Sequence, residues 1–362
     1  NGSADQTISV SASGSYTVTV TDLNGCSTTS AATAVTVTPL PTVASITGNT
    51  GVCVGSTTTM SSATTGGVWT SSNTGVATIS TGGVVTGVTA GTTTITYTVT
   101  VGGCTNTATT TVTVNSLPTA TIAAASATTF CDGGSVTLMG PSAPAGMTYT
   151  YVWNLNGTAI TGATGNTYIA AASGSYTVTV TNNNGCSATS AATVVTENPL
   201  PTVAAITGTT AVCVGSGTTL ANATTGGTWS SSNTATATVN ASTGVVTGVN
   251  AGTVTITYTV TNSNGCTNTS TATVTVNALP TPTITASGAT TFCSGSSVVL
   301  TASSASTYQW NLNGTAIAGA TSATYTATAA GSYSVTVTNA NGCTATSGAT
   351  SVTVNALPTA TI

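Results

Sequence analysis

Residues 174–186 read GSYTVTVTNNNGC, and this stretch decides the fold. From Tyr176 to Thr181 apolar residues alternate with threonines. Because a period of two places successive side chains on opposite faces, the stretch predicts a β-strand with one buried and one solvated face. The Asn-Gly pair that follows predicts a tight hairpin turn. The same stretch returns as GSYSVTVTNANGC at 331–343 and as GSYTVTVTDLNGC at 14–26.

A Leu-Pro-Thr motif recurs with a period of roughly 80 residues, which is the size of one small domain. Proline fixes φ and lacks a backbone donor, so it suits a junction between domains. The linkers are short and carry no Gly/Ser tract, which favours a semi-rigid array. The boundaries that we expect are 1–39 for a C-terminal half-domain, then 40–116, 117–199, 200–278 and 279–356 for complete domains, and 357–362 for the start of another.

The repeats are of two alternating types. The first type opens on Phe-Cys, continues through Trp-Asn-Leu-Asn-Gly and closes on Asn-Gly-Cys, as in 130–186 and 292–343, and its second half is seen at 14–26. The second type opens on Val-Cys-Val-Gly-Ser and carries Gly-Val-Val-Thr-Gly, as in 52–104 and 212–266. No window shows the 3.6-residue spacing of a helix. About seven short strands in roughly 80 residues predict an all-β tandem array of antiparallel sandwiches.

The composition excludes most chemistry. The chain of 362 residues has no Lys, Arg or His, and its four acids, Asp5, Asp22, Asp132 and Glu197, give a net charge of -4. General acid–base catalysis, hydroxyl nucleophiles and calcium sites all need side chains that are missing or isolated here. Nucleic-acid binding depends on Lys and Arg. We therefore expect no enzyme, no cofactor, no metal site and no nucleic-acid partner.

Membrane insertion is not expected either, because no apolar run approaches the roughly 18 residues of a spanning helix. No signal peptide is visible. The repeat pattern begins and ends within a repeat, so we expect an internal window of a longer polypeptide.

Each complete repeat holds two cysteines, one near its start and one just after its last hairpin turn. This arrangement predicts one disulfide inside each domain, which would close a loop of roughly 50 residues and stabilise a small sandwich by about 4 kcal/mol. Disulfides persist in oxidising compartments, so we expect an extracellular or cell-surface chain. The expected pairs are Cys53 with Cys104, Cys131 with Cys186, Cys213 with Cys266, and Cys293 with Cys343, with Cys26 unpaired because its half-domain lacks a mate.

One tryptophan lies between the two cysteines of each complete repeat, namely Trp69, Trp153, Trp229 and Trp310. The position favours a core tryptophan packed against the disulfide. The alternative is an exposed aromatic platform that stacks on sugars.

These strings resemble known families. The Trp-Thr-Ser-Ser-Asn to Ile-Thr-Tyr pattern at 69–97, and its copy at 229–258, resembles the bacterial immunoglobulin-like group 2 domain. The first type is similar to the immunoglobulin-like repeats of large Bacteroidetes surface proteins. The resemblance implies immunoglobulin-like sandwiches, which serve as stalks in adhesins, gliding-motility surface proteins and multidomain secreted enzymes.

The leading functional hypothesis is a bacterial filament or adhesin stalk that self-associates into fibres or attaches to a cell surface. The near absence of charge favours association, because little repulsion keeps chains apart. The alternatives are carbohydrate- or surface-binding accessory modules, and ice or crystal binding through Thr-x-Thr ladders. Sequons for glycans occur at Asn1, Asn156, Asn222, Asn240, Asn268 and Asn313.

Overall fold

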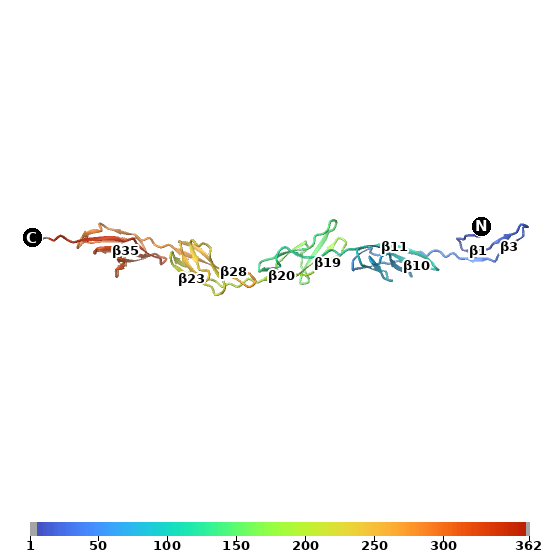
Figure 1. Ribbon diagram of the computed structural model, residues 1–362, viewed down its shortest axis with the longest axis horizontal. Helices are drawn as coiled ribbons and strands as arrows, with labels where there is room; N and C mark the ends of the chain where they lie inside the picture. The colour runs from blue at the N-terminus through green and yellow to red at the C-terminus, as the bar shows by residue number, and fades with distance from the viewer. Residues whose placement is uncertain (1–5, 360–362) are drawn as a thin grey trace. The chain divides into compact units, whose positions relative to one another are not determined.

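The computed structural model describes residues 6–359, and every regular element in that range is a β-strand (Figure 1). The all-β prediction is confirmed, and the strands form a tandem array of immunoglobulin-like sandwiches. The chain divides into two compact units. Unit 1 holds Asn1–Thr129 and Gly134–Glu197, and unit 2 holds Phe130–Gly133 and Asn198–Ile362. Each unit is described by itself.

Unit 1 begins with two small antiparallel pairs, β1 with β4 and β2 with β3. Almost all their side chains are exposed, because within the described residues no second sheet covers these two pairs. The bounds are Gly14–Tyr16 for β1, Thr19–Thr21 for β2, Ser27–Thr29 for β3 and Thr33–Val35 for β4.

The next sandwich of unit 1 has one sheet in the order β5-β11-β10-β7 and a second in the order β6-β9-β8. Alternate valines and isoleucines of both sheets meet in the core, among them Val85, Ile95 and Val112, each fully buried. The strands are β5 (Gly51–Cys53), β6 (Thr57–Thr59), β7 (Val68–Ser71), β8 (Ala77–Ile79), β9 (Val84–Gly87), β10 (Gly91–Val101) and β11 (Cys104–Asn115).

The last sandwich of unit 1 has the sheets β12-β14-β17 and β20-β18-β15-β16, with β19 on β18. Trp153 and Tyr176 fill its core. The strands are β12 (Ala123–Ala124), β14 (Val136–Met139), β15 (Tyr149–Leu155), β16 (Thr158–Ala159), β17 (Thr167–Ala170), β18 (Gly174–Asn182), β19 (Ser187–Thr189) and β20 (Thr193–Asn198). The short strand β13 (Thr129–Cys131) ends at a cysteine, Cys131.

Unit 2 repeats both designs. A second-type sandwich has the sheets β22-β28-β27-β24 and β21-β23-β26-β25. Its strands are β21 (Thr207–Gly208), β22 (Ala211–Cys213), β23 (Gly217–Ala221), β24 (Thr228–Ser231), β25 (Ala237–Val239), β26 (Val245–Gly248), β27 (Gly252–Thr261) and β28 (Thr267–Asn277).

The first-type sandwich of unit 2 has the sheets β29-β31-β34 and β30-β37-β35-β32-β33, with β36 on β35. Trp310 and Tyr333 lie in its core. Its strands are β29 (Ile284–Ala286), β30 (Thr291–Cys293), β31 (Val298–Ala302), β32 (Thr307–Leu312), β33 (Thr315–Ala316), β34 (Thr324–Ala327), β35 (Gly331–Thr338), β36 (Thr344–Thr346) and β37 (Thr350–Asn355).

The long hairpins of the second-type repeats present ladders of threonine pairs. In β10 and β11 the paired residues run from Thr92 opposite Thr113 to Thr100 opposite Thr105, two residues a step. The hairpin β27–β28 repeats the ladder from Thr253 opposite Thr275 to Thr261 opposite Thr267. β-Branched threonine suits a half-exposed strand face, so these uncharged ladders stabilise the hairpins without any ion pair.

A buried tyrosine gives the first-type repeat a predictable response to alkali. Tyr333 donates its hydroxyl to the carbonyl of Ala329 at 3.0 Å, and burial, with a smaller contribution from Tyr325, raises the pKa of Tyr333 above its usual value. The folded state therefore favours the protonated form of Tyr333. The resulting contribution to the free energy of unfolding is fully present below the unfolded tyrosine pKa of about 10 and is lost as the pH rises above it. We expect stability in urea to fall as the pH rises above about 10, and to fall less steeply in Tyr333→Phe. Parallel curves for the two proteins would contradict this assignment.

Candidate functional site: the disulfide junctions

The first cysteine of each complete repeat lies beside the end of that repeat's last strand. We call these the early cysteines: Cys53, Cys131, Cys213 and Cys293. Cys53 is the register partner of Asn115, where β5 runs parallel to β11. Cys213 and Cys293 pair in the same way with Asn277 and Asn355. The parallel pairing therefore fixes each of these three early cysteines at one end of its sandwich.

The second cysteine lies at the opposite end. We call these the late cysteines: Cys26, Cys104, Cys186, Cys266 and Cys343. Cys104 begins β11, and Asn115 ends it. At the usual rise of a strand the two ends of β11 are roughly 35 Å apart. Cys53 beside Asn115 is therefore far from Cys104.

The predicted disulfides inside each domain are consequently wrong. A disulfide needs Cα atoms about 4.4–6.8 Å apart. The structure instead joins Cys53 to Cys186, Cys131 to Cys266, and Cys213 to Cys343, with Cα–Cα distances of 5.6, 5.5 and 5.7 Å. Each bond links the early cysteine of one repeat to the late cysteine of the next. The pairs Cys53–Cys104, Cys131–Cys186, Cys213–Cys266 and Cys293–Cys343 do not form.

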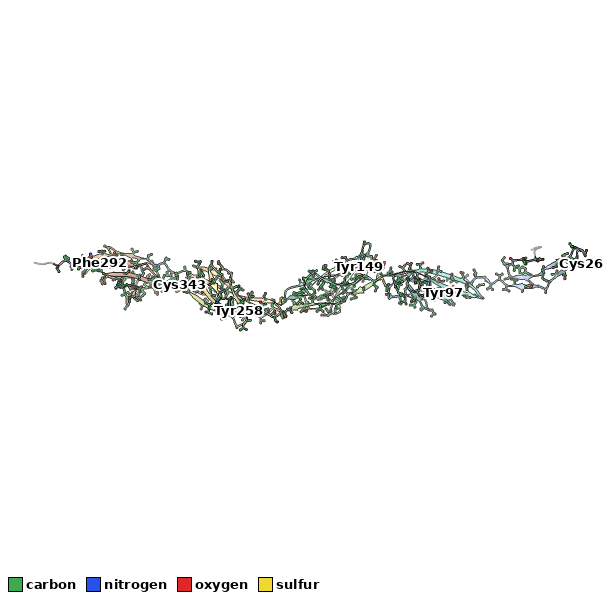
Figure 2. All side chains as sticks on the ribbon, in the orientation of Figure 1. Cys26, Tyr97, Tyr149, Tyr258, Phe292 and Cys343 are labelled. Atoms are coloured by element: carbon green, nitrogen blue, oxygen red, sulfur yellow. A yellow bond between two sulfur atoms is a disulfide. The ribbon has the colours of Figure 1, made fainter. Side chains whose placement is uncertain are left out.

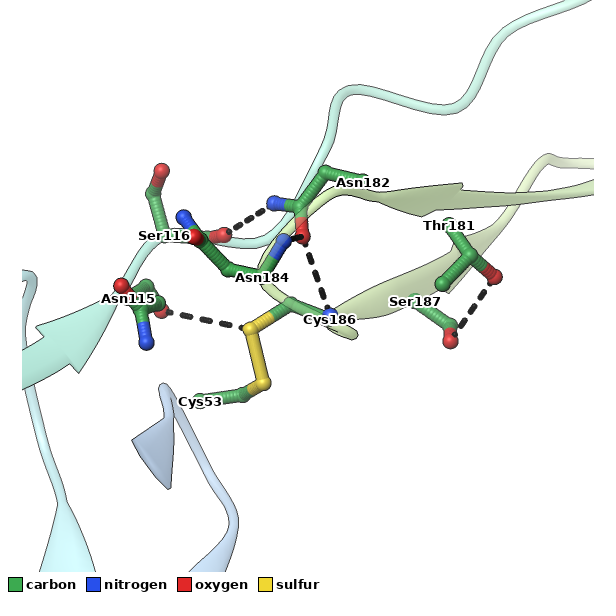
Figure 3. The surroundings of a disulfide bond; sticks show 8 residues. All are labelled: Cys53, Asn115, Ser116, Thr181, Asn182, Asn184, Cys186 and Ser187. Carbon is green, nitrogen blue, oxygen red and sulfur yellow. Dashed lines mark hydrogen bonds between the residues drawn. A yellow bond between two sulfur atoms is a disulfide. The ribbon is translucent and has the colours of Figure 1, made fainter. Parts of the chain in front are cut away.

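The junction in unit 1 shows how the sequence builds this contact (Figure 3). The Val54 N–H donates to the carbonyl of Asn115 at 3.0 Å, which holds Cys53 at the strand end. The same carbonyl lies 4.0 Å from Sγ of Cys186. Asn182 of the hairpin donates its side-chain amide to the carbonyl of Ser116 at 3.1 Å. Backbone and side chain thus dock the hairpin onto the linker beside the disulfide.

Both junctions in unit 2 use the same contacts. Asn262 donates to the carbonyl of Pro199 at 2.9 Å, and Asn339 donates to that of Ala278 at 3.0 Å. Sγ of Cys266 lies 3.9 Å from the Asn198 carbonyl, and Sγ of Cys343 lies 3.9 Å from the Asn277 carbonyl. The junction geometry is therefore the same whether a first-type repeat precedes a second-type repeat or follows it.

The hairpin asparagine shapes the turn as well as docking it. Oδ1 of Asn262 accepts the N–H groups of Asn264 and Cys266, both at 3.0 Å. The turn needs Gly265, whose φ of +80° suits a residue without Cβ. The recurring string Asn-x-Asn-Gly-Cys at 182–186, 262–266 and 339–343 carried this signal, but the prediction treated it only as a turn.

Removing the docking amide should loosen a junction. Asn262→Asp keeps the oxygen that caps the turn, as Asp22 does in the first hairpin, but removes the donor to Pro199. We expect the Cys131–Cys266 bond to become about 1–2 kcal/mol easier to reduce, a shift of roughly 20–40 mV in glutathione titrations. Asn264→Asp is the matched control, because only the backbone of Asn264 enters these contacts. Equal shifts in both variants would refute the docking role.

Three cysteines form no disulfide within the described residues. Cys26 and Cys293 are exposed and Cys104 is partly buried. Figure 2 labels Cys26, which follows the turn between β2 and β3. Sγ of Cys104 lies 3.6 Å from the carbonyl of Thr38, which stands three residues before Pro41, as Asn115 stands before Pro118. Cys104 is therefore placed like a paired late cysteine.

The tryptophans lie in the cores of the sandwiches, away from the junctions. Trp153 and Trp310 are fully buried and donate their indole N–H groups to the carbonyls of Gly165 and Ser322. Trp229 is 7% exposed, and Trp69 is half-buried. Each packs on a tyrosine: Trp69 on Tyr97, Trp153 on Tyr168, Trp229 on Tyr258 and Trp310 on Tyr325. The expected packing partner, a disulfide, is thus replaced by an aromatic ring.

The part of the chain that the structure describes contains no cluster of three or more acidic, cysteine or histidine side chains that could hold a metal ion. No helix in the same range is long and apolar enough to cross a membrane.

The sandwiches form a tandem immunoglobulin-like array, and the sequence of one repeat also matches a domain family. Residues 200–270 match the model of the bacterial Ig-like domain (group 2), which confirms the resemblance seen in this segment. No curated protein matches the chain in sequence.

Several solved structures are similar to this chain at low sequence identity. The calcium-stabilised adhesin with which an Antarctic bacterium binds ice is 16% identical, covering 87% of this chain and 100% of that one, with a TM-score of 0.32. The D1–D4 ectodomain fragment of ICAM-5 is 12% identical, covering 86% and 99%, with a TM-score of 0.35. The I67–I69 fragment of titin is 12% identical, covering 65% and 96%, with a TM-score of 0.28.

Proposed function

We propose that this chain is a tension-bearing stalk segment of a secreted or cell-surface bacterial filament or adhesin, and not an enzyme. The observation that carries the proposal is the repeated junction: three disulfides, each joining one repeat to the next with the same docking contacts. Every such junction has two covalent connections, the linker and the disulfide. A second connection restrains the repeats and shares any pulling force, which suits a stalk.

The remaining sequence features support the same role. The mechanical units that we propose are the repeats 40–116, 117–199, 200–278 and 279–356. Disulfides persist outside the reducing cytosol, which supports export. The absence of Lys, Arg and His removes trypsin cleavage sites and leaves a nearly uncharged surface, which favours association of stalks into fibres.

A sugar-stacking role has little support from the aromatic residues. Stacking needs an exposed ring face, whereas Trp153, Trp229 and Trp310 are buried. The carbohydrate-binding alternative thereby loses most of the residues that motivated it.

Glycans would add solubility to the uncharged surface. The sequon asparagines differ in whether their amide groups are hydrogen-bonded within the fold or exposed. The amide groups of Asn222 and Asn268 donate to the carbonyls of Ala204 and Pro201, so they are engaged in the fold. Asn156, Asn240 and Asn313 are exposed and are the acceptors that we propose. Asn1 lies outside the described residues.

Immunogold electron microscopy of the source cells tests the proposed role. An antibody raised against this chain should label fibres or projections outside the cell. Washing intact cells with reductant should leave the label in place, because the peptide linkers remain. Label confined to the cytosol would contradict the proposal, and so would free cysteines at all three junctions in protein taken from cells.

A further inference from the structure

In the repeat 279–356, β30 carries a complete early half of a junction. Phe292 and Cys293 pair in register with Val354 and Asn355, as Val52 and Cys53 pair with Val114 and Asn115. The N–H after the cysteine donates to the asparagine carbonyl in both places, from Ser294 to Asn355 at 2.8 Å and from Val54 to Asn115 at 3.0 Å. Cys293 is exposed at this position.

The equivalent cysteines show what this half accepts. Cys53, Cys131 and Cys213 occupy the same position in their repeats, and each is bonded to a late cysteine. They accept late cysteines from repeats of both types, since Cys266 belongs to a second-type repeat and Cys186 and Cys343 belong to first-type repeats. Formation of the disulfide therefore depends on the hairpin and linker contacts, and not on the type of the repeat that supplies the late cysteine.

We infer that Cys293 is an open half-junction that forms a disulfide with the late cysteine of another immunoglobulin-like repeat. The repeat belongs either to the same polypeptide, after residue 356, or to a second copy of this chain. Cys104 against the Thr38 carbonyl and Cys26 on its Asp-x-Asn-Gly-Cys turn are late halves of the same design. The inference rests on the proposed stalk function. It adds to that function a further disulfide of the same kind, formed at Cys293.

The bond forms by thiol–disulfide exchange with a small-molecule disulfide such as oxidised glutathione. The Cys293 thiolate attacks one sulfur of that disulfide and releases one glutathione thiolate. The thiolate of the late cysteine then attacks the Cys293 sulfur and releases the second. The two protein thiols lose two electrons, glutathione disulfide gains them, and the two thiol protons pass to the released glutathione.

The native protein tests the inference directly. Source cells are extracted with N-ethylmaleimide and without reductant, the protein is digested with pepsin in acid, and the partner of Cys293 is identified by mass spectrometry. We expect the Cys293 peptide to be bonded to a cysteine that follows Asn-Gly or Gly-Gly. A partner containing residues 24–26 or 102–104, in a species that has twice the mass of the chain until it is reduced, identifies a second copy, and a partner absent from the present sequence identifies a following repeat. Cys293 blocked by N-ethylmaleimide, or bonded to Cys343, overturns the inference.

The recombinant chain tests the geometry when incubated in a glutathione redox buffer at high concentration. If copies join, the chain forms a ladder of oligomers on non-reducing gels that Cys293→Ser abolishes. The control Cys293→Ser/Ser294→Cys moves the thiol out of β30 and into the turn that follows the strand. It should not restore the ladder, and a ladder in either variant counts against the inference. A blocked Cys293 beside intact internal junctions would leave the stalk function standing.

Discussion

Reducing the disulfides should lengthen the fully stretched segment between Cys53 and Cys343 roughly tenfold. With the bonds intact, the shortest covalent path runs through Cys53–Cys186, along the chain from Cys186 to Cys213, and through Cys213–Cys343. At about 3.5 Å per residue this path is about 105 Å long. Without the bonds the path follows the whole chain from Cys53 to Cys343, which is about 1,000 Å. Reduction should therefore add about 900 Å.

Single-molecule pulling measures this gain as the difference in contour length before and after reductant. Disulfides inside each domain would leave the three segments between successive domains in the path, or about 300 Å, and the gain would be only about 700 Å. A non-reduced wild-type chain that unravels repeat by repeat would contradict the junctions.

The double variant Cys213→Ser/Cys343→Ser is the graded control for this measurement. Its shortest path runs through Cys53–Cys186, back along the chain to Cys131, through Cys131–Cys266 and on to position 343. That path is about 470 Å long, so reduction should add only about 550 Å in this variant.

Replacing the core tryptophan of the repeat that holds Cys293 should destabilise that repeat severely. Trp310 is fully buried, packs against Tyr325 with the two rings tilted, and donates to the Ser322 carbonyl at 3.0 Å. Trp310→Ala leaves a cavity and an unpaired carbonyl, so we expect a loss of about 3–5 kcal/mol. That is a large share of the roughly 5–15 kcal/mol that stabilises a typical domain.

Hydrogen exchange localises the effect. The most protected amides of 284–355 should exchange at least a hundredfold faster in Trp310→Ala, because about 3 kcal/mol or more has been lost. Amides of 203–276 provide the internal reference, since their core is a separate cluster. Trp69→Ala, at a half-buried position, is the comparison variant and should cost less. Unchanged exchange in 284–355 would show that Trp310 does not hold this core.

The alternation of apolar residues with threonines predicted the strands well, because it shows which side chains lie on the buried face of each strand and which on the exposed face. The stretch 174–186 became β18 and its turn, and the Gly-Val-Val-Thr-Gly motif became β9 and β26. The core positions of the tryptophans followed from their recurrence between the two cysteines of each repeat. Local patterning sufficed there, because period-two burial depends on near neighbours.

The disulfide pairing could not be obtained from spacing. The cysteines recur as regularly inside repeats as they do in the observed bonds, whose sequence separations are 133, 135 and 130. The deciding fact is the parallel pairing of Cys53 with Asn115, which joins the first and last strands of one repeat. That pairing sends the early cysteine to one end of the sandwich and leaves the late cysteine on the hairpin at the other.

The disulfide map of the oxidised chain tests the central claim most directly. Because the chain lacks Lys and Arg, trypsin is replaced by pepsin, and its acid medium also suppresses thiol exchange. Non-reducing mass spectrometry should recover Cys53 linked to Cys186, Cys131 to Cys266, and Cys213 to Cys343. Peptides linking Cys53 to Cys104, Cys131 to Cys186, and Cys213 to Cys266 would contradict the junctions and the stalk mechanism built on them.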